Sequence, residues 1–221
     1  MSPSNPDSLP LPRWQRRPDA RPDEILDAAQ AVFGNAGFAR ATLEEVARIA
    51  GVSKGTLYLY FDSKETLFRE MVRARIVTAV AEGEALFREH QGSCRELLAL
   101  LMRRMWSVVR TPEMARIGRL VLSELPNFPE VAQFYFDEVI LRSRRLVESV
   151  IERGIVSGEF RPSARRVAPR AICSMLVHSA QVQCFFSAYD PAALDEQQLL
   201  AGAIDLVLDG VATHPTDDPR P

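Results

Sequence analysis

A short polar segment near residue 50 carries side chains suited to binding nucleic acid. Hydroxyl, ammonium and phenolic groups lie close together within it, on Ser53, Lys54, Thr56, Tyr58 and Tyr60. Such groups donate hydrogen bonds to DNA phosphates and to base edges in the major groove. Gly55 lies among them and costs a helix about 1 kcal/mol relative to alanine, so we expect its backbone to approach a phosphate closely. The alternative is that Leu57, Phe61 and one tyrosine pack the domain while the rest is a solvated face.

Two short helices joined at a tight turn are expected to position these side chains. Thr42 and Glu45 predict a capping box at the start of the first helix. Gly51 lies where that helix must end in a left-handed residue. A small residue (Ala47), a glycine four positions later and a branched apolar residue (Leu57) six beyond that are typical of a helix-turn-helix motif. Its second helix, expected over 53–61, would lie in the DNA major groove.

The chain after this motif predicts a long connecting helix. Asp62 or Ser63 caps it, and Lys64 falls in its first turn, where free N–H groups and an ammonium together can hold a phosphate. Apolar residues at helical spacing continue to about His90. A helix of this length belongs to both halves of the chain, so it is expected to transmit movement between them.

The whole segment resembles the N-terminal domain of the TetR family of bacterial transcriptional regulators. The resemblance is nearly gapless from about Ile25 to Phe68, whereas beyond Phe68 only length and helical pattern agree. It rests on Thr42, Val46-Ala47, Ala50-Gly51-Val52-Ser53, Gly55-Thr56-Leu57-Tyr58, Tyr60-Phe61, Lys64-Glu65 and Leu67. The resemblance implies a homodimer that binds near-palindromic operator DNA and releases it when a small molecule enters the second domain. The expected DNA-binding residues are Thr42, Ser53, Lys54, Gly55, Thr56, Tyr58, Tyr60 and Lys64.

The expected fold is all-α, with about nine helices. A three-helix helix-turn-helix domain over 21–68 precedes a helical ligand-binding and dimerisation domain over 69–212, and 1–20 and 213–221 form a disordered arm and tail. Arginines in the arm either reach into the minor groove or are solvated; the arm holds Arg13, Trp14, Arg16 and Arg17, and Arg21 follows.

Capping and proline signals divide the remainder into further helices. Ser93 with Glu96 opens one as a capping box, and Thr111-Pro112 stops it and starts the next. After a double-proline break at 125–129, helices are expected over about 130–153, 163–189 and 195–212. Pro169 either kinks the second of these or marks its start.

The last two helices are expected to form the dimer interface. They are apolar on more than one side, and a helix with this pattern must be covered on both faces. The same pair from a second subunit would cover them as a four-helix interface; the alternative is an ordinary core. The expected interface residues are Ala171, Ser174, Ser179, Leu200, Ile204, Val207, Leu208 and Val211.

Apolar residues mixed with a few polar ones indicate an effector pocket in the second domain. Each of them can equally be an ordinary core residue. The apolar and aromatic residues considered are Met102, Met105, Trp106, Leu120, Phe134, Met175, His178 and Phe185, and the possible polar anchors are Arg116, Arg119, Glu124 and Gln181.

Bulk composition is compatible with this interpretation. The chain has 221 residues, is 47% hydrophobic and carries a formal net charge of −2, which does not favour DNA affinity because phosphates must be neutralised. No apolar run is expected to reach the roughly 18 residues of a membrane helix, and there is no signal-peptide core, so we expect a cytoplasmic protein. Three unpaired cysteines favour reduced thiols. No cofactor is expected.

Two enzymatic interpretations are less consistent with the sequence than a DNA-binding regulator. Residues 51–55 match the G-x-S-x-G elbow of hydrolases, but that motif needs a preceding strand and a nearby histidine. A metal site from Cys173, His178 and Cys184 is disfavoured because their spacings do not keep them on one helix face. The sequence therefore predicts a ligand-responsive DNA-binding transcriptional regulator that acts as a repressor. The alternative is a protein-interaction module on the same fold without sequence-specific DNA binding.

Overall fold

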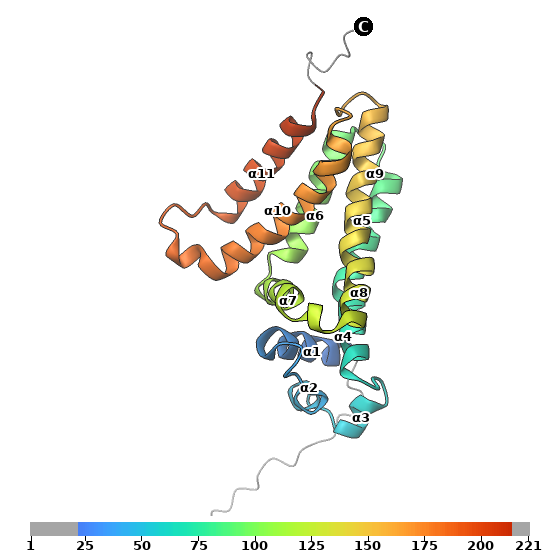
Figure 1. Ribbon diagram of the computed structural model, residues 1–221, viewed down its shortest axis with the longest axis vertical. Coiled ribbons are helices and arrows are strands. Elements are labelled where there is room, and N and C mark those ends of the chain that lie inside the picture. Colours follow the sequence, from blue (N-terminus) through green and yellow to red (C-terminus); the bar gives the residue numbers. More distant parts are fainter. Residues whose placement is uncertain (1–21, 214–221) are drawn as a thin grey trace, which may run out of the picture.

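The computed structural model describes residues 22–213, which are almost entirely helical (Figure 1). The predicted arm and all but the first residue of the predicted tail lie outside them. The only β feature in this range is an isolated bridge between Phe160 and Ala212. The helices are α1 (Pro22–Ala36), α2 (Leu43–Ala50), α3 (Lys54–Tyr58), α4 (Lys64–Val72), α5 (Thr78–Glu89), α6 (Cys94–Val109), α7 (Pro112–Ser123), α8 (Pro129–Tyr135), α9 (Arg142–Val156), α10 (Ala164–Phe186) and α11 (Glu196–Val211).

Two pairs of these helices are continuous rods. A π-helical segment, Arg73–Val77, joins α4 to α5, and a second one, Phe136–Leu141, joins α8 to α9. The rods run side by side along the length of the molecule (Figure 1). With each rod counted as one helix, residues 22–213 hold nine helices, which agrees with the predicted all-α fold.

The helix-turn-helix forms as the sequence predicts, with two local differences. Gly51 has φ +69° and donates its N–H to the Ala47 and Arg48 carbonyls, which ends α2. The Thr42 side chain accepts from the Glu45 N–H, but the reciprocal half of the predicted capping box is absent, and the Glu45 carboxylate lies 3.9 Å from Arg48 instead. Regular helix α3 ends at Tyr58 rather than at residue 61, because the chain turns there: the Tyr60 N–H already bonds to the carbonyl three residues back.

The apolar core is divided into two clusters, and the first does not stop at the predicted domain boundary. Phe33, Phe38 and Phe68 pack with ring centroids 5.3–5.7 Å apart. This cluster continues over α7 through Ile117 and Leu120 and over α8 through Val131. The second cluster joins α6, α9, α10 and α11. Helix α7 therefore packs against the DNA-binding half as well as against the second half of the chain.

Helix α10 decides one open alternative and corrects one expectation. It begins at Ala164 and passes through Pro169, so Pro169 does not mark its start. The helical stretch Ala164–Tyr189 is also long and apolar enough to cross a membrane by length and composition alone, which the sequence analysis did not expect. A core helix passes the same test, but only 17% of this apolar window is buried. The exposed apolar face of α10 is therefore expected to pack against another apolar surface.

Substitution of two glycines should separate backbone strain from loss of a contact. Gly51 and Gly37 both have positive φ, and alanine there costs about 1 kcal/mol. An alanine Cβ at Gly51 meets open space, but at Gly37 it would overlap the Glu124 carboxylate, which accepts the Ala39 N–H at 3.0 Å. We expect Gly37→Ala to lower the free energy of unfolding by about 1 kcal/mol more than Gly51→Ala, measured by urea unfolding at one protein concentration. In a Glu124→Ala background the two costs should become equal; a persistent difference would contradict this assignment.

Candidate nucleic-acid interface and effector cavity

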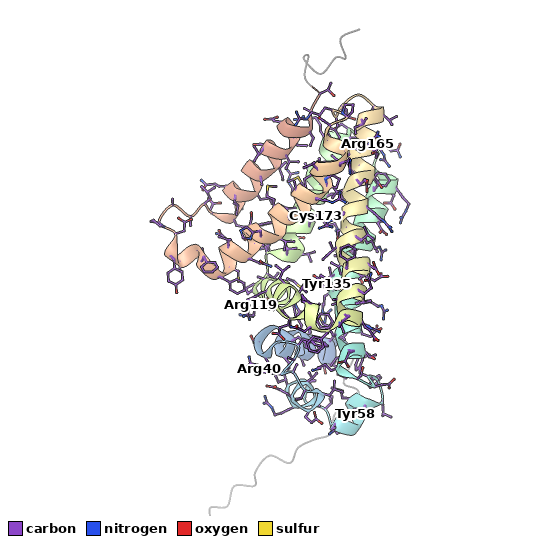
Figure 2. All side chains as sticks on the ribbon, viewed as in Figure 1. Arg40, Tyr58, Arg119, Tyr135, Arg165 and Cys173 are labelled. Carbon is purple, nitrogen blue, oxygen red and sulfur yellow. The ribbon has the colours of Figure 1, made fainter. Side chains whose placement is uncertain are left out.

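The surface of α3 separates packing residues from exposed ones. Leu57 and Phe61 are buried, whereas Tyr58 and Tyr60 are 42% and 51% exposed. Figure 2 shows Tyr58 at the end of the molecule formed by α2 and α3. Neither tyrosine is used for core packing, so both phenols are free to contact a ligand.

The hydroxyl groups at the start of α3 are partly engaged within the motif. Ser53 accepts the Thr56 N–H at 3.0 Å, and the two side-chain oxygens lie 2.7 Å apart. No histidine bonds to Ser53 within residues 22–213, and helix α2 rather than a strand precedes it. Ser53 therefore acts as a helix cap here and lacks the surroundings of a hydrolase nucleophile.

Lys54 is exposed and held by acidic and aromatic neighbours. Its ammonium pairs with Glu44 of α2 and lies 5.6 Å from the centre of the Tyr58 ring. The hydrogen bond with Glu44 raises the pKa of Lys54, and the same bond lowers the pKa of Glu44. A phosphate binding to Lys54 must therefore compete with Glu44.

The Lys64 ammonium group is hydrogen-bonded to the backbone of the helix-turn-helix domain. Its Nζ donates to the carbonyls of Phe38 and Ala39 at 2.9 and 3.2 Å and lies 4.8 Å from the centre of the Phe38 ring. Lys64 thus ties the start of α4 to the α1–α2 turn. The two bonds leave one N–H of the ammonium for the predicted phosphate contact.

The structure also exposes residues that the sequence analysis did not select. Arg48 on α2 has a side chain that is 72% exposed, and Leu59 after α3 is 83% exposed. Arg40 is exposed in the α1–α2 turn (Figure 2). A guanidinium suits phosphate contacts and a leucine suits a thymine methyl group. Only their positions next to the motif could have indicated them.

A cavity of about 390 Å³ lies in the second half of the chain. Its walls come from α5, α6, α7, α8, α9 and α10 and from both π-helical segments, and they are mainly apolar. Three of the predicted effector residues line it: Met105, His178 and Gln181. The volume falls in the lower part of the range of small-molecule pockets, about 300–1,000 Å³.

The other predicted effector residues do not line the cavity, because helical periodicity directs them elsewhere. Met102 and Trp106 face the second core, and the Trp106 indole donates to Glu196 at 3.0 Å. Met175 packs against the same core, and Leu120 faces α1. Phe134 lies under the guanidinium groups of Arg69 and Arg73, while Arg116 lies near Glu113 and against Gly34. Phe185, Arg119 and Glu124 are likewise absent from the lining.

Several polar groups of the cavity were missed by the sequence analysis. Arg104, Tyr135, Ser143, Arg144 and Cys173 all line it. Figure 2 labels Tyr135 on the α8–α9 rod and Cys173 on α10. Burial raises the pKa of Tyr135 to about 12 and that of Cys173 to about 11. These residues come from helices far apart in sequence, so no local pattern indicates them.

The predicted dimer residues divide into buried and exposed sets. Ile204 and Val211 are only 4% and 5% exposed within the single chain, which removes them from an interface. Leu200, Val207 and Leu208 pack against the same internal core. Ala171 and Ser174 are exposed on α10 and Ser179 is half-buried. Exposed apolar side chains that the prediction omitted lie on the outer faces of α10 and α11, namely Val167, Val182, Phe186 and Leu206.

Comparisons with known proteins agree with this architecture. A model of bacterial regulatory proteins of the tetR family matches residues 25–71, and one of the C-terminal domain of AefR-like transcriptional repressors matches residues 96–210. The chain is 26% identical over 148 residues to the fatty acid metabolism regulator protein of Bacillus subtilis, covering 66% of this chain and 73% of that protein. It is 25% identical over 154 residues to the transcriptional repressor KstR2 of Mycolicibacterium smegmatis, covering 68% and 73%.

Solved structures show the same fold. The regulator FadR of Bacillus subtilis, crystallised with stearoyl-CoA, superposes with a TM-score of 0.71 at 20% identity, over 86% of this chain and 100% of that one. KstR2 of Mycobacterium tuberculosis superposes with a TM-score of 0.66 at 23% identity, over 91% and 100%.

Thiol labelling should report on the cavity. Only a thiolate reacts with iodoacetamide, so a pKa of about 11 keeps Cys173 mainly unreactive below that pH. At about pH 8 we expect Cys173 to label at least about tenfold more slowly in the folded protein than in urea, with a rate that rises with pH. Mass spectrometry of the labelled peptide measures both rates. Equal rates in the two states would show that the thiol is open to solvent.

Proposed function

Because this chain belongs to the TetR family of bacterial regulatory proteins, we propose that it is a cytoplasmic, ligand-responsive transcriptional repressor. The observation that carries the proposal is one continuous set of helices that presents α3 at one end and encloses a cavity further along. No metal, cofactor or catalytic step is required. An effector in the cavity would release the protein from its operator.

DNA recognition is proposed to centre on α3. Its exposed side chains, Lys54 and Tyr58, would enter the major groove, with Ser53, Gly55 and Thr56 close to the phosphates and Tyr60 beyond them. Thr42 caps α2 at the neighbouring edge of the motif. In a two-fold symmetric dimer, two copies of α3 would read half-sites of a near-palindrome about one helical turn apart or somewhat more.

The effector is proposed to be small and largely apolar. Helix α7 supports coupling to DNA, because one face of it, including Met114 and Gly118, lines the cavity while Ile117 packs against α1. The two rods contribute as well, since Ile76 and Val139 line the cavity from their π-helical segments. A ligand that shifts these walls would reposition α1 and α4, and with them α3. The stearoyl-CoA bound to the Bacillus subtilis regulator is a related precedent for a ligand with a long apolar chain.

A second copy of the chain is proposed to cover the outer faces of α10 and α11. These faces expose apolar side chains, with Val167 at 67% and Leu206 at 70%, next to small residues such as Ala171. Gly202 and Gly210 of α11 have open space beside them, which allows close approach of another helix. A homodimer would remove this apolar surface from water and give the two recognition helices their symmetry.

Operator binding should depend on Tyr58 and Lys64. Tyr58→Ala removes an exposed phenol, and Lys64→Ala releases the α1–α2 turn and any phosphate contact, so we expect each to weaken operator affinity about tenfold or more. Gel-shift measurements test this on an operator obtained by selection of bound DNA fragments, and sedimentation checks that dimerisation is intact. Tyr189→Ala is the matched control, because Tyr189 is 82% exposed outside the motif. Unchanged DNA affinity in both variants, or binding without sequence or salt dependence, would favour the protein-interaction module instead.

The dimer should depend on the outer face of α10 and α11. Replacing Ala171 and Leu206 together by arginine places two like charges per subunit in the proposed interface, so we expect a monomer in sedimentation velocity. Val156→Arg is the control, because Val156 is 86% exposed at the end of α9 and outside this surface. The proposed interface is contradicted if the wild-type protein is monomeric or if the double variant stays dimeric. A wild-type protein that is monomeric but binds lipid vesicles would assign the apolar face to a membrane.

A further inference from the structure

One arginine of the cavity has no partner. Arg144 lies on α9 and lines the cavity, and its Nε is buried without a hydrogen-bond acceptor. Within residues 22–213 no carboxylate pairs with it, although its neighbour Arg142 binds Glu84 through two hydrogen bonds of 2.6 and 2.8 Å. A buried N–H without an acceptor is unfavourable, so the half-buried Arg144 side chain presents an unused donor and a positive charge to the cavity.

The cavity itself supplies no compensating charge. None of its lining residues is Asp or Glu, and its other arginine, Arg104, pairs with Glu82 of α5. The remaining polar groups around it are neutral or weakly basic, namely Tyr135, Ser143, Cys173, Ser174, His178 and Gln181. The electrostatic character of the cavity is therefore positive and is set by Arg144.

Neighbouring groups support this location of the charge. Burial raises the pKa of the Cys173 thiol, while the positive charge of Arg144 partly offsets that rise, which puts the guanidinium close to α10. On the same helix the Gln181 Nε2 is also buried without an acceptor. A Cβ on Gly118 would come within 2.6 Å of that amide, so α7 holds it in place. Two unsatisfied donors thus line one apolar cavity.

We propose that the effector is an apolar monocarboxylate whose carboxylate binds Arg144, with the Gln181 amide as a secondary donor. This inference rests on the proposed function and names its ligand class. A guanidinium binds a carboxylate through two parallel hydrogen bonds, while the hydrocarbon part fills the apolar remainder of the cavity. An uncharged ligand would bind Arg144 more weakly, because it carries no charge to pair with the guanidinium.

Calorimetric titration with matched probes tests the charge requirement directly. The wild-type protein is titrated with decanoate, decan-1-ol and decanoyl-CoA, and with the bulkier acid adamantane-1-carboxylate. We expect at least one of the two acids to bind about tenfold or more tightly than decan-1-ol. Equal affinity for acid and alcohol, tighter binding of the thioester than of the acids, or no binding of either acid would overturn the proposal.

Variants locate the charge at Arg144. We expect Arg144→Gln to weaken acid binding about 10- to 100-fold and to leave alcohol binding almost unchanged, while Arg144→Lys retains the preference for the acid. Arg145→Gln is the matched control, because it removes the same charge from an exposed neighbour outside this cavity. An unchanged acid preference in Arg144→Gln, with its helical circular dichroism intact, would overturn the assignment.

These measurements contain no DNA, so they separate this inference from the proposed function. If the acid binds through Arg144 but operator binding is absent, the ligand class holds and the repressor proposal fails. If operator binding is present but acids do not bind, the repressor proposal holds and the ligand class fails. When both hold, the acid should release operator from the wild-type protein but not from Arg144→Gln at the same concentration.

Discussion

The packing of α7 between α1 and the cavity is the constraint on which the rest of the structure depends. Ile117 and Leu120 belong to the core of the DNA-binding half, while Met114 and Gly118 line the cavity. Close packing transmits strain because a well-packed interior leaves few voids. A single short helix therefore serves as a wall shared by the two halves, and the Glu124 bond to the Ala39 N–H joins its C-terminal end to the α1–α2 turn.

Local signals predicted most of the fold. The Gly51 turn, the caps at Thr42, Ser63 and Ser93 and the long helix to His90 all depend on residues a few positions apart, and all are present. Errors arose where tertiary packing decides the outcome. Ile204 and Val211 form an apolar stripe that suits an interface equally well, but their own α6 and α10 cover it. The predicted end of α3, at residue 61, also lies beyond its observed end at Tyr58.

The candidate sites also divide into residues that local sequence indicates and residues that only tertiary packing brings together. The predicted DNA-binding residues are close in sequence, so their types and spacing suffice to propose them, although the contacts of Lys64 with Phe38 and Ala39 could not be read from sequence. The cavity was different because its walls come from six helices and two π-helical segments. Met102 and Met105 look equivalent in the sequence, yet only Met105 reaches the cavity. Arg144 had no local signal at all.

The two π-helical segments are the places where each rod absorbs a change in chain length. In Arg73–Val77 the Thr78 N–H bonds to the Arg73 carbonyl five residues earlier, so this stretch holds one residue more than an α-helical path would. In a regular α-helix one extra residue would rotate everything beyond it by about 100°. The wide π-helical turn takes up that residue locally, so α4 and α5 keep the faces that contact the motif and the cavity. A rod of this kind can therefore lose one residue at the π-helical segment and keep α3 in nearly its present orientation, whereas a deletion within α4 or α5 would rotate α3 relative to the cavity.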